Sequence, residues 1–133
     1  MHEVRLRIRW RDIDNYGYVN NAVYLNYLEE CRDRMVEELF GADEAWDFVL
    51  AHVGIDYRRQ LTQSDGDVIV RCEVAGIGRS SIRTRERVEK RDGTLAAEAE
   101  AVIVPRAPGE AASRPLTDEE RAILQRAVSA PAG

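Results

Sequence analysis

Residues 20–41 read NNAVYLNYLEECRDRMVEELFG, and this stretch carries the clearest helical pattern in the chain. Its apolar side chains recur at intervals of three and four residues, which places them on one broad face of a helix. The apolar positions are Tyr24, Tyr27, Leu28, Cys31, Met35 and Leu39, and the polar positions are Glu29, Arg32, Asp33, Glu37 and Glu38. Asn20 or Asn21 is suited to cap the first turn, and Gly41 to end the helix. The stretch predicts one long amphipathic helix.

The segments on either side of this helix have the patterns of β-strands. Residues 4–10 (VRLRIRW) alternate apolar and basic side chains, which is typical of a half-buried strand. Four more strands are expected after the helix, over residues 48–57 and on toward Leu61, and over 68–74, 81–88 and 95–104. Turn residues at 64–67 and 91–93 separate them, and Gly76 and Gly78 interrupt the pattern of the third strand.

The C-terminal segment predicts a short second helix. Thr117 and Glu120 have the spacing of a capping box, so the helix is expected from Thr117 to about Val128. Residues 129–133 are expected to fray, and residues 42–46 to hold one extra turn. The order is strand, long helix, four strands and short helix, without repeat or linker. It predicts a single α+β domain over residues 1–133, with an antiparallel sheet.

A single helix can cover only one face of such a sheet. In a chain of 133 residues the other face of the sheet, or at least an edge strand, then remains partly exposed. Proteins commonly manage an open edge by pairing it with the edge of a second copy. We therefore expect at least a dimer.

Composition narrows the classes of function. The chain is 44% hydrophobic and 32% charged, and its net charge of −5 argues against general binding to nucleic acid or to an anionic membrane. No apolar run approaches the ~20 residues that cross a bilayer, and the charged start of the chain does not resemble a secretion signal. Cys31 and Cys72 are too few and too far apart for a disulfide framework or a metal site. We expect a cytoplasmic protein.

Residues 9–32, RWRDIDNYGYVNNAVYLNYLEECR, resemble the hotdog-fold acyl-CoA thioesterases around 4-hydroxybenzoyl-CoA thioesterase. That family typically shows D-x-D at the end of a strand, then G-H-V-N-N or a variant, then Y-x-x-x-x-E-x-x-R in a helix. The matching positions here are Asp12, Asp14, Gly17, Val19, Asn20, Asn21, Tyr24, Glu29 and Arg32. The resemblance implies a hotdog fold, in which the sheet wraps around the long central helix, and a thioesterase activity. Tyr18 stands where the family commonly has histidine, and family members vary there.

The resemblance also implies roles for individual residues. Asp14 is the implied catalytic carboxylate, either as a nucleophile that forms a mixed anhydride or as a general base on water. The free amides of the first helical turn, at Asn21, are implied to polarise the thioester carbonyl. This chemistry requires no metal or organic cofactor. The implied substrate-binding positions are Gly17, Tyr18, Val19, Asn20, Tyr24, Ser80 and Ser81, together with Arg58, Arg59 and Arg79 for the phosphates of CoA.

Several of these residues also have ordinary structural interpretations. Asp14 suits a turn, and Asp12 is expected to satisfy loop amides or to pair with Arg9 or Arg11. Glu29 is a candidate second carboxylate, although such a residue more often forms a surface ion pair at i,i+3 within its helix. The expected partner in that pair is Arg32, and Cys31 is expected to be a buried packing thiol.

Three functions remain open from the sequence. The leading one is hydrolysis of acyl-CoA, and a close variant takes the acyl group from acyl carrier protein in a lipid or polyketide pathway. The third is a non-catalytic module that binds acyl thioesters. Tyr18, in place of the common histidine, keeps this possibility open, whereas the presence of Asp14 argues against it. A hotdog dehydratase is disfavoured because its chemistry relies on a histidine base. The family implies a homodimer or a homotetramer built from dimers.

Overall fold

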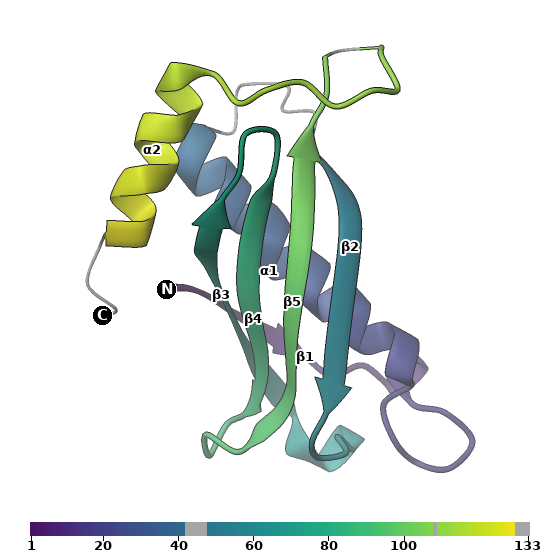
Figure 1. Ribbon diagram of the computed structural model, residues 1–133. Coiled ribbons are helices and arrows are strands. Elements are labelled where there is room, and N and C mark those ends of the chain that lie inside the picture. The colour runs from purple at the N-terminus through teal and green to yellow at the C-terminus, as the bar shows by residue number, and fades with distance from the viewer. Residues whose placement is uncertain (42–47, 108, 130–133) are drawn as a thin grey trace.

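The computed structural model describes residues 1–41, 48–107 and 109–129 (Figure 1). The extra turn expected at 42–46 lies outside these residues, as do residues 130–133 of the segment expected to fray, whereas Ser129 of that segment is helical. The helices and strands are β1 (His2–Arg7), α1 (Asn21–Phe40), β2 (Phe48–Tyr57), β3 (Asp67–Ile77), β4 (Ile82–Lys90), β5 (Leu95–Pro105) and α2 (Asp118–Ser129). Short 3-10 turns, η1 (Trp10–Asp12) and η2 (Gln63–Asp65), precede α1 and β3. The expected order of elements is confirmed.

Several strand boundaries differ from the expectation, most clearly at the ends of β1 and β3. The first strand ends at Arg7 rather than at Trp10: the Ile8 amide still bonds to the Gly66 carbonyl (2.8 Å), in register with the β1-β3 pairing, and the chain then turns into η1. The strand over 68–74 is β3 and continues through Gly76 to Ile77, with a bulge at Ala75 after which Gly76 pairs with Arg83. The sheet is therefore longer at that end than the sequence suggested.

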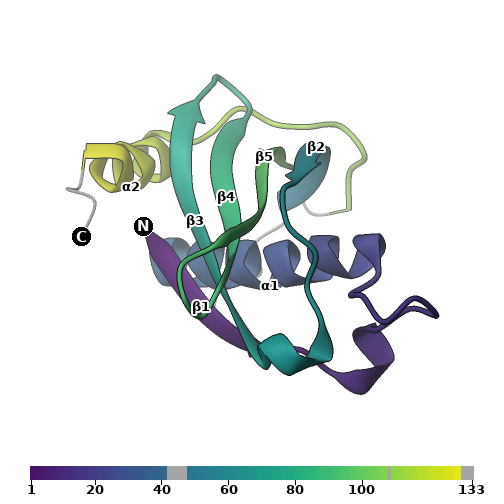
Figure 2. The ribbon, with the colours of Figure 1, turned by 90° about the horizontal axis from the view of Figure 1, so that it is seen from below.

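The five strands form one antiparallel sheet in the order β1-β3-β4-β5-β2. Helix α1 lies along one face of the sheet, as Figure 2 shows from below, while β1 and β2 form the two edges. Alternate side chains of the inner strands point into the core, including Val68, Val70 and Cys72 on β3. Cys31 of α1 is buried against Cys72, so its expected role as a packing thiol is confirmed. No described helix is long and apolar enough to span a membrane.

Arg32 departs most from the sequence-based expectation. It was assigned to the polar face of the helix, yet it is only 5% exposed and faces β4. Its Nε and Nη2 atoms donate to the two carboxylate oxygens of Glu86 at 2.8 and 2.7 Å, and Thr84 Oγ1 donates to the same carboxylate at 2.7 Å. Burial lowers the pKa of Arg32, but the hydrogen bonds and charge of Glu86 outweigh it and hold that pKa above its usual value. The predicted surface pair with Glu29 is wrong, because the helix turns Arg32 toward a buried carboxylate on the sheet.

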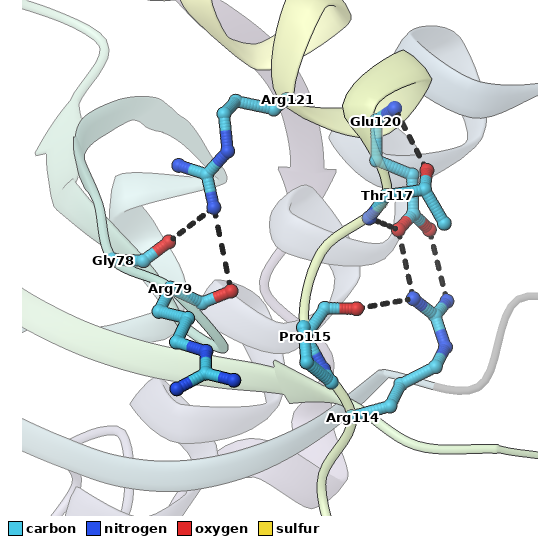
Figure 3. Close-up of polar contacts among 7 residues, drawn as sticks. All are labelled: Gly78, Arg79, Arg114, Pro115, Thr117, Glu120 and Arg121. Carbon is cyan, nitrogen blue, oxygen red and sulfur yellow. Dashed lines mark hydrogen bonds and ion pairs between the residues drawn. The ribbon is translucent and has the colours of Figure 1, made fainter.

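Helix α2 begins with the capping box that the sequence indicates. The Glu120 amide donates to Thr117 Oγ1 (3.1 Å), and the Thr117 amide donates to the Glu120 carboxylate (2.9 Å). Arg114 binds that carboxylate through both terminal nitrogens, at 2.8 and 2.9 Å (Figure 3). Leu124 is fully buried, and Ile123 packs against the same core. The segment thus ends the fold by closing the core beside β3.

Candidate active site

Asp14 organises the loop between η1 and α1. Its carboxylate Oδ1 accepts hydrogen bonds from the amides of Tyr16 (2.8 Å) and Tyr18 (3.2 Å), and its own amide donates to the Tyr18 carbonyl (2.8 Å). Gly17 has a φ of +88°, which suits the tight turn because glycine carries no Cβ. Asp14 is therefore a turn residue, as the structural interpretation of the sequence predicted. Its second oxygen, Oδ2, accepts no hydrogen bond within the described part of the chain.

The N-terminus of α1 lies directly behind this loop. Asn20 is the N-cap, and its side-chain oxygen accepts from the Ala22 amide at 2.8 Å. Asn21 is the first residue of the helix, and its amide belongs to the group that has no partner inside a helix. The hydroxyl of Tyr57, at the end of β2, donates to the Asn21 carbonyl at 2.8 Å. This contact joins the end of an edge strand to the start of the helix.

A cleft of about 620 Å³ opens at this junction. Its lining residues are Asp14, Tyr16, Tyr18, Val19, Asn21, Tyr24, Tyr57, Arg58, Arg59 and Gln60. The rings of Tyr24 and Tyr57 meet edge to face at 5.0 Å and form one wall, while Tyr16 stands 86% exposed at the rim. Burial raises the pKa of Tyr24, so its phenol stays protonated at neutral pH.

The cleft brings together seven of the residues that the sequence singled out. They are Asp14, Tyr18, Val19, Asn21, Tyr24, Arg58 and Arg59. Gly17 and Asn20 do not line the cleft, but they shape its loop and cap its helix. Tyr16, Tyr57 and Gln60 also line the cleft and were not identified from the sequence. Tyr57 is an aromatic residue at the end of a strand, and only the fold shows that this end meets the helix N-terminus.

The two cleft arginines differ in their partners. Arg58 forms ion pairs with Glu98 and Asp56, and the hydrogen bond and charge of Glu98 hold the pKa of Arg58 above its usual value. Arg59 donates from Nη1 to the Arg58 carbonyl at 2.8 Å and makes no ion pair among the described residues. Arg59 is consequently the more available of the two for an anionic ligand.

The turn at residues 79–81 lies at the other end of the sheet. Ile82 and Leu50 are both paired with Ile103 of β5, so the turn lies at the level of the start of β2. The Asp14 cleft instead adjoins Tyr57, at the end of β2. Seven residues of extended chain separate these levels, on the order of 20 Å. Within one chain, Arg79, Ser80 and Ser81 are therefore not part of the cleft.

The carbonyls of this turn are held by α2. Arg121 donates from Nη2 to the carbonyl oxygens of Gly78 (3.2 Å) and Arg79 (3.4 Å), as Figure 3 shows. The Leu116 amide donates to the same Arg79 carbonyl at 2.9 Å. The Arg79 side chain is exposed and points away from these contacts (Figure 3). The turn is thus rigidly attached while its guanidinium remains open to solvent.

Glu29 lines a second groove rather than the cleft. This groove, of about 490 Å³, lies between α1 and the start of β2, with Val36, Phe48 and Leu50 among its lining residues. Asp33 lies on the same surface, and burial, followed by the charge of Glu29, raises the pKa of the Asp33 carboxyl. The groove thus combines apolar side chains with the helix carboxylates Glu29, Asp33 and Glu37.

No group of three or more His, Cys, Asp or Glu side chains is placed to hold a metal ion within residues 1–41, 48–107 and 109–129. The chemistry available at the cleft is that of a carboxylate beside helix amides, with tyrosines and an arginine around it. Such a site can polarise a carbonyl and deliver a nucleophile or a base to it.

The fold and this site define a class, the hotdog-fold thioesterases. The model of the Thioesterase-like superfamily matches residues 8–119, and the chain belongs to that family. A thioesterase from Thermus thermophilus, solved with coenzyme A and Zn, is 34% identical. The comparison covers 98% of this chain and 96% of that one, with a TM-score of 0.86. The expected hotdog fold is confirmed.

More distant similarities extend the comparison. A Staphylococcus aureus protein solved in complex with CoA has a TM-score of 0.85 at 14% identity, over 96% of this chain and 83% of that one, which shows the fold alone. The chloroplastic acyl-acyl carrier protein thioesterase ATL3 of Arabidopsis thaliana is 45% identical over 38 residues. Those 38 residues are 29% of this chain and only 20% of the length of that relative.

Proposed function

We propose that this protein hydrolyses acyl-CoA thioesters, with Asp14 as the catalytic carboxylate. Thioester hydrolysis is the chemistry of the family, and the proposal concerns the substrate and the residues. The observation that carries it is the unbonded Oδ2 atom of Asp14, in a cleft that also contains the first residue of α1. Loop amides bind Oδ1 and orient the carboxylate, so the residue serves the turn and leaves one oxygen for chemistry.

The proposed reaction begins with a thioester carbonyl bound at the N-terminus of α1. There the Asn21 amide and the helix dipole stabilise the oxyanion that develops as the carbonyl is attacked. In one route Asp14 attacks, the C–S bond breaks with loss of the thiolate, and water then hydrolyses the mixed anhydride. In the other, Asp14 takes a proton from water, the resulting hydroxide attacks, and the proton passes to the departing thiolate. Both routes use the same geometry, and neither needs the histidine that Tyr18 replaces.

CoA is the proposed donor because the Thermus thermophilus relative was solved with coenzyme A and because Arg59 lies in the cleft without an acidic partner among the described residues. A carrier-protein donor is the second candidate, supported by the short match to ATL3. A module that only binds acyl thioesters is the third. We further propose a cytoplasmic location.

We also propose that the chain works as a homodimer, or as a tetramer of such dimers, through the edge strand β2. Strand β2 pairs with β5 on one side, and its other side is an edge of the sheet. Antiparallel pairing with a second copy would set the start of one β2 beside the end of the other. The apolar groove at Phe48 and Leu50, the Glu29 surface and the turn at 79–81 would then approach the Asp14 cleft of the second copy. These candidate residues would gain a place near the site only in such an assembly.

The test is a thiol-release assay over aromatic and aliphatic acyl-CoAs of short and long chain. Asp14→Ala should lower kcat/KM by about 100-fold or more, the size expected for loss of a catalytic acid–base group. Asp14→Asn keeps an oxygen that can accept from the Tyr16 and Tyr18 amides, so it should preserve the loop and still lose activity.

Asp92→Ala is the matched control, because Asp92 makes the same kind of turn bond to the Thr94 amide (2.9 Å) in a distant hairpin. It should leave kcat/KM unchanged. Full activity in a folded Asp14→Asn variant, or no turnover of any acyl-CoA by the unaltered protein, would refute the proposal. Parallel assays with acyl carrier protein substrates separate the second candidate from the first.

A further inference from the structure

The first carboxylate of the D-x-D segment, Asp12, makes contacts that its expected role did not include. It is only 2% exposed, and its Oδ2 atom accepts from the Arg9 amide at 2.9 Å, as a loop-binding residue would. The same oxygen also accepts from the hydroxyl of Tyr27 on α1 at 2.8 Å. Its main-chain carbonyl accepts from the Asn20 amide at 2.9 Å. One residue therefore bonds to the N-cap of η1, to the cap of α1 and to the body of α1.

These bonds enclose the loop that carries Asp14. The loop is residues 13–19, and its two ends meet in the bridge between Ile13 and Val19. The bonds from Asp14 to the Tyr16 and Tyr18 amides stay inside the loop, so they hold its shape but not its place on the helix. The base of the loop is joined to the segment after β2 by the Val19 amide, which donates to the Leu61 carbonyl (2.8 Å), and to α1 by the bonds of Asp12.

Tyr27 supplies such a join at a second point of the helix. It lies seven residues after the Asn20 cap, which is about two helical turns along the axis. Its ring is buried in the core, so its hydroxyl has a fixed position relative to the helix. The bonds at Leu61 and at the cap both lie at the base of the loop, whereas the Tyr27 bond adds a point farther along the helix and limits rotation of the loop about its base.

We propose that Tyr27 and Asp12 are a positioning pair for the Asp14 loop. Their hydrogen bond sets the angle at which Asp14 approaches a carbonyl bound at the N-terminus of α1. The inference rests on the proposed function of Asp14 and adds residues that touch neither substrate nor reacting atoms. Neither side chain lines the cleft, so their loss should affect turnover and leave substrate binding almost unchanged.

The chemistry of the pair suits a permanent bond. Burial, followed by the hydrogen bond to Asp12, raises the pKa of Tyr27 well above its usual range. The phenol consequently remains a donor at every pH at which a carboxylate catalyst works. The negative charge of Asp12 is shared among the phenol, the Arg9 amide and the Arg9 guanidinium, whose Nη2 lies 3.4 Å from Oδ1.

Tyr27→Phe tests the pair by removing a single oxygen atom. We expect kcat for acyl-CoA hydrolysis to fall roughly 10-fold or more with KM within about 2-fold, because small errors in the approach of a catalytic group cost up to about 100-fold. Asp12→Asn, with its amide oxygen in the place of Oδ2, keeps the acceptor for both Tyr27 and the Arg9 amide. It should retain much more activity than Asp12→Ala.

The matched control is Thr84→Val. Like Tyr27, Thr84 donates its hydroxyl to a buried carboxylate, here Glu86 at 2.7 Å, but it does so on β4 and away from the loop. Both variants should lose a similar amount of stability, and only Tyr27→Phe should lose kcat. Hydrogen exchange of the Asn20 amide, which donates to the Asp12 carbonyl, gives a readout independent of activity, and it should quicken in Tyr27→Phe and not in the control.

Unchanged kcat, or equal losses of kcat in Tyr27→Phe and Thr84→Val, would overturn the pair while leaving the proposed function intact. Unchanged amide exchange in Tyr27→Phe would overturn it as well. If the unaltered protein turned over no thioester, the proposed function would fail first, and with it the catalytic part of this inference. The exchange experiment would then still decide whether Tyr27 holds the loop.

Discussion

The ion pair between Arg32 and Glu86 allows a quantitative test of how α1 is held against the sheet. The two side chains are 5% and 0% exposed, and they share two hydrogen bonds of 2.8 and 2.7 Å. Replacing Glu86 by leucine leaves a buried guanidinium without its partner, and replacing Arg32 by methionine leaves a buried carboxylate with only the Thr84 hydroxyl. Breaking a buried pair in this way costs about 3–5 kcal/mol of unfolding free energy.

The double variant Arg32→Met/Glu86→Leu should behave differently. Removing both charges together also removes the cost of burying them, and such replacements are often neutral or stabilising. The Thr84 hydroxyl would lose its acceptor, at a cost of about 1–3 kcal/mol. We therefore expect the double variant to lie within about 2 kcal/mol of the unaltered protein and well above either single variant.

Urea unfolding at one fixed protein concentration measures these differences, since association would otherwise shift the apparent stability. With an unfolding entropy of about 2.1 cal/mol/K per residue, a loss of 4 kcal/mol in a chain of this length lowers Tm by roughly 14 °C. Glu30 and Arg34 form an exposed i,i+4 pair on the same helix (2.8 Å), and their replacement should change stability by less than about 0.5 kcal/mol. A double variant whose loss equals the sum of the two single losses would refute the reasoning.

Two further predictions concern the ends of the fold. The hydrogen bonds from Arg114, followed by those at Thr117, hold the pKa of Glu120 below its usual value, and this outweighs the opposing effect of burial. A depressed pKa in the folded state adds stability above the unfolded pKa, which is lost as pH falls through the folded value. Thermal unfolding between pH 6 and pH 3 should therefore show Tm converging for the unaltered protein and Glu120→Gln at the acid end, and a constant difference would contradict this. Light scattering should find a dimer at micromolar concentration. Leu50→Lys on the exposed edge strand β2 should weaken the affinity of the dimer by about 10-fold or more. A monodisperse monomer would count against edge pairing.

The sequence was most informative where structure depends on near neighbours. The period of α1 follows from side chains three and four residues apart, and its ends follow from Asn20 and Gly41, which act on the adjacent turn. The capping box at Thr117 and Glu120 is equally local. The Asp14 loop belongs here too, because its aspartate, glycine and helix cap are contiguous, and that contiguity is what the family resemblance detected.

Contacts between distant segments were beyond the reach of these patterns. Arg32 and Glu86 are 54 positions apart, and only the packing of α1 on β4 turns an apparent surface arginine into a buried one. The order of the strands decided that Tyr57 and Arg59 meet the Asp14 loop, while Arg79 lies at the far end of the sheet. The sequence by itself determined the elements, their caps and the catalytic candidate, because those depend on interactions within a few residues. Only the tertiary structure decided which charges are buried and which side chains share the cleft, because these depend on the arrangement of elements in space.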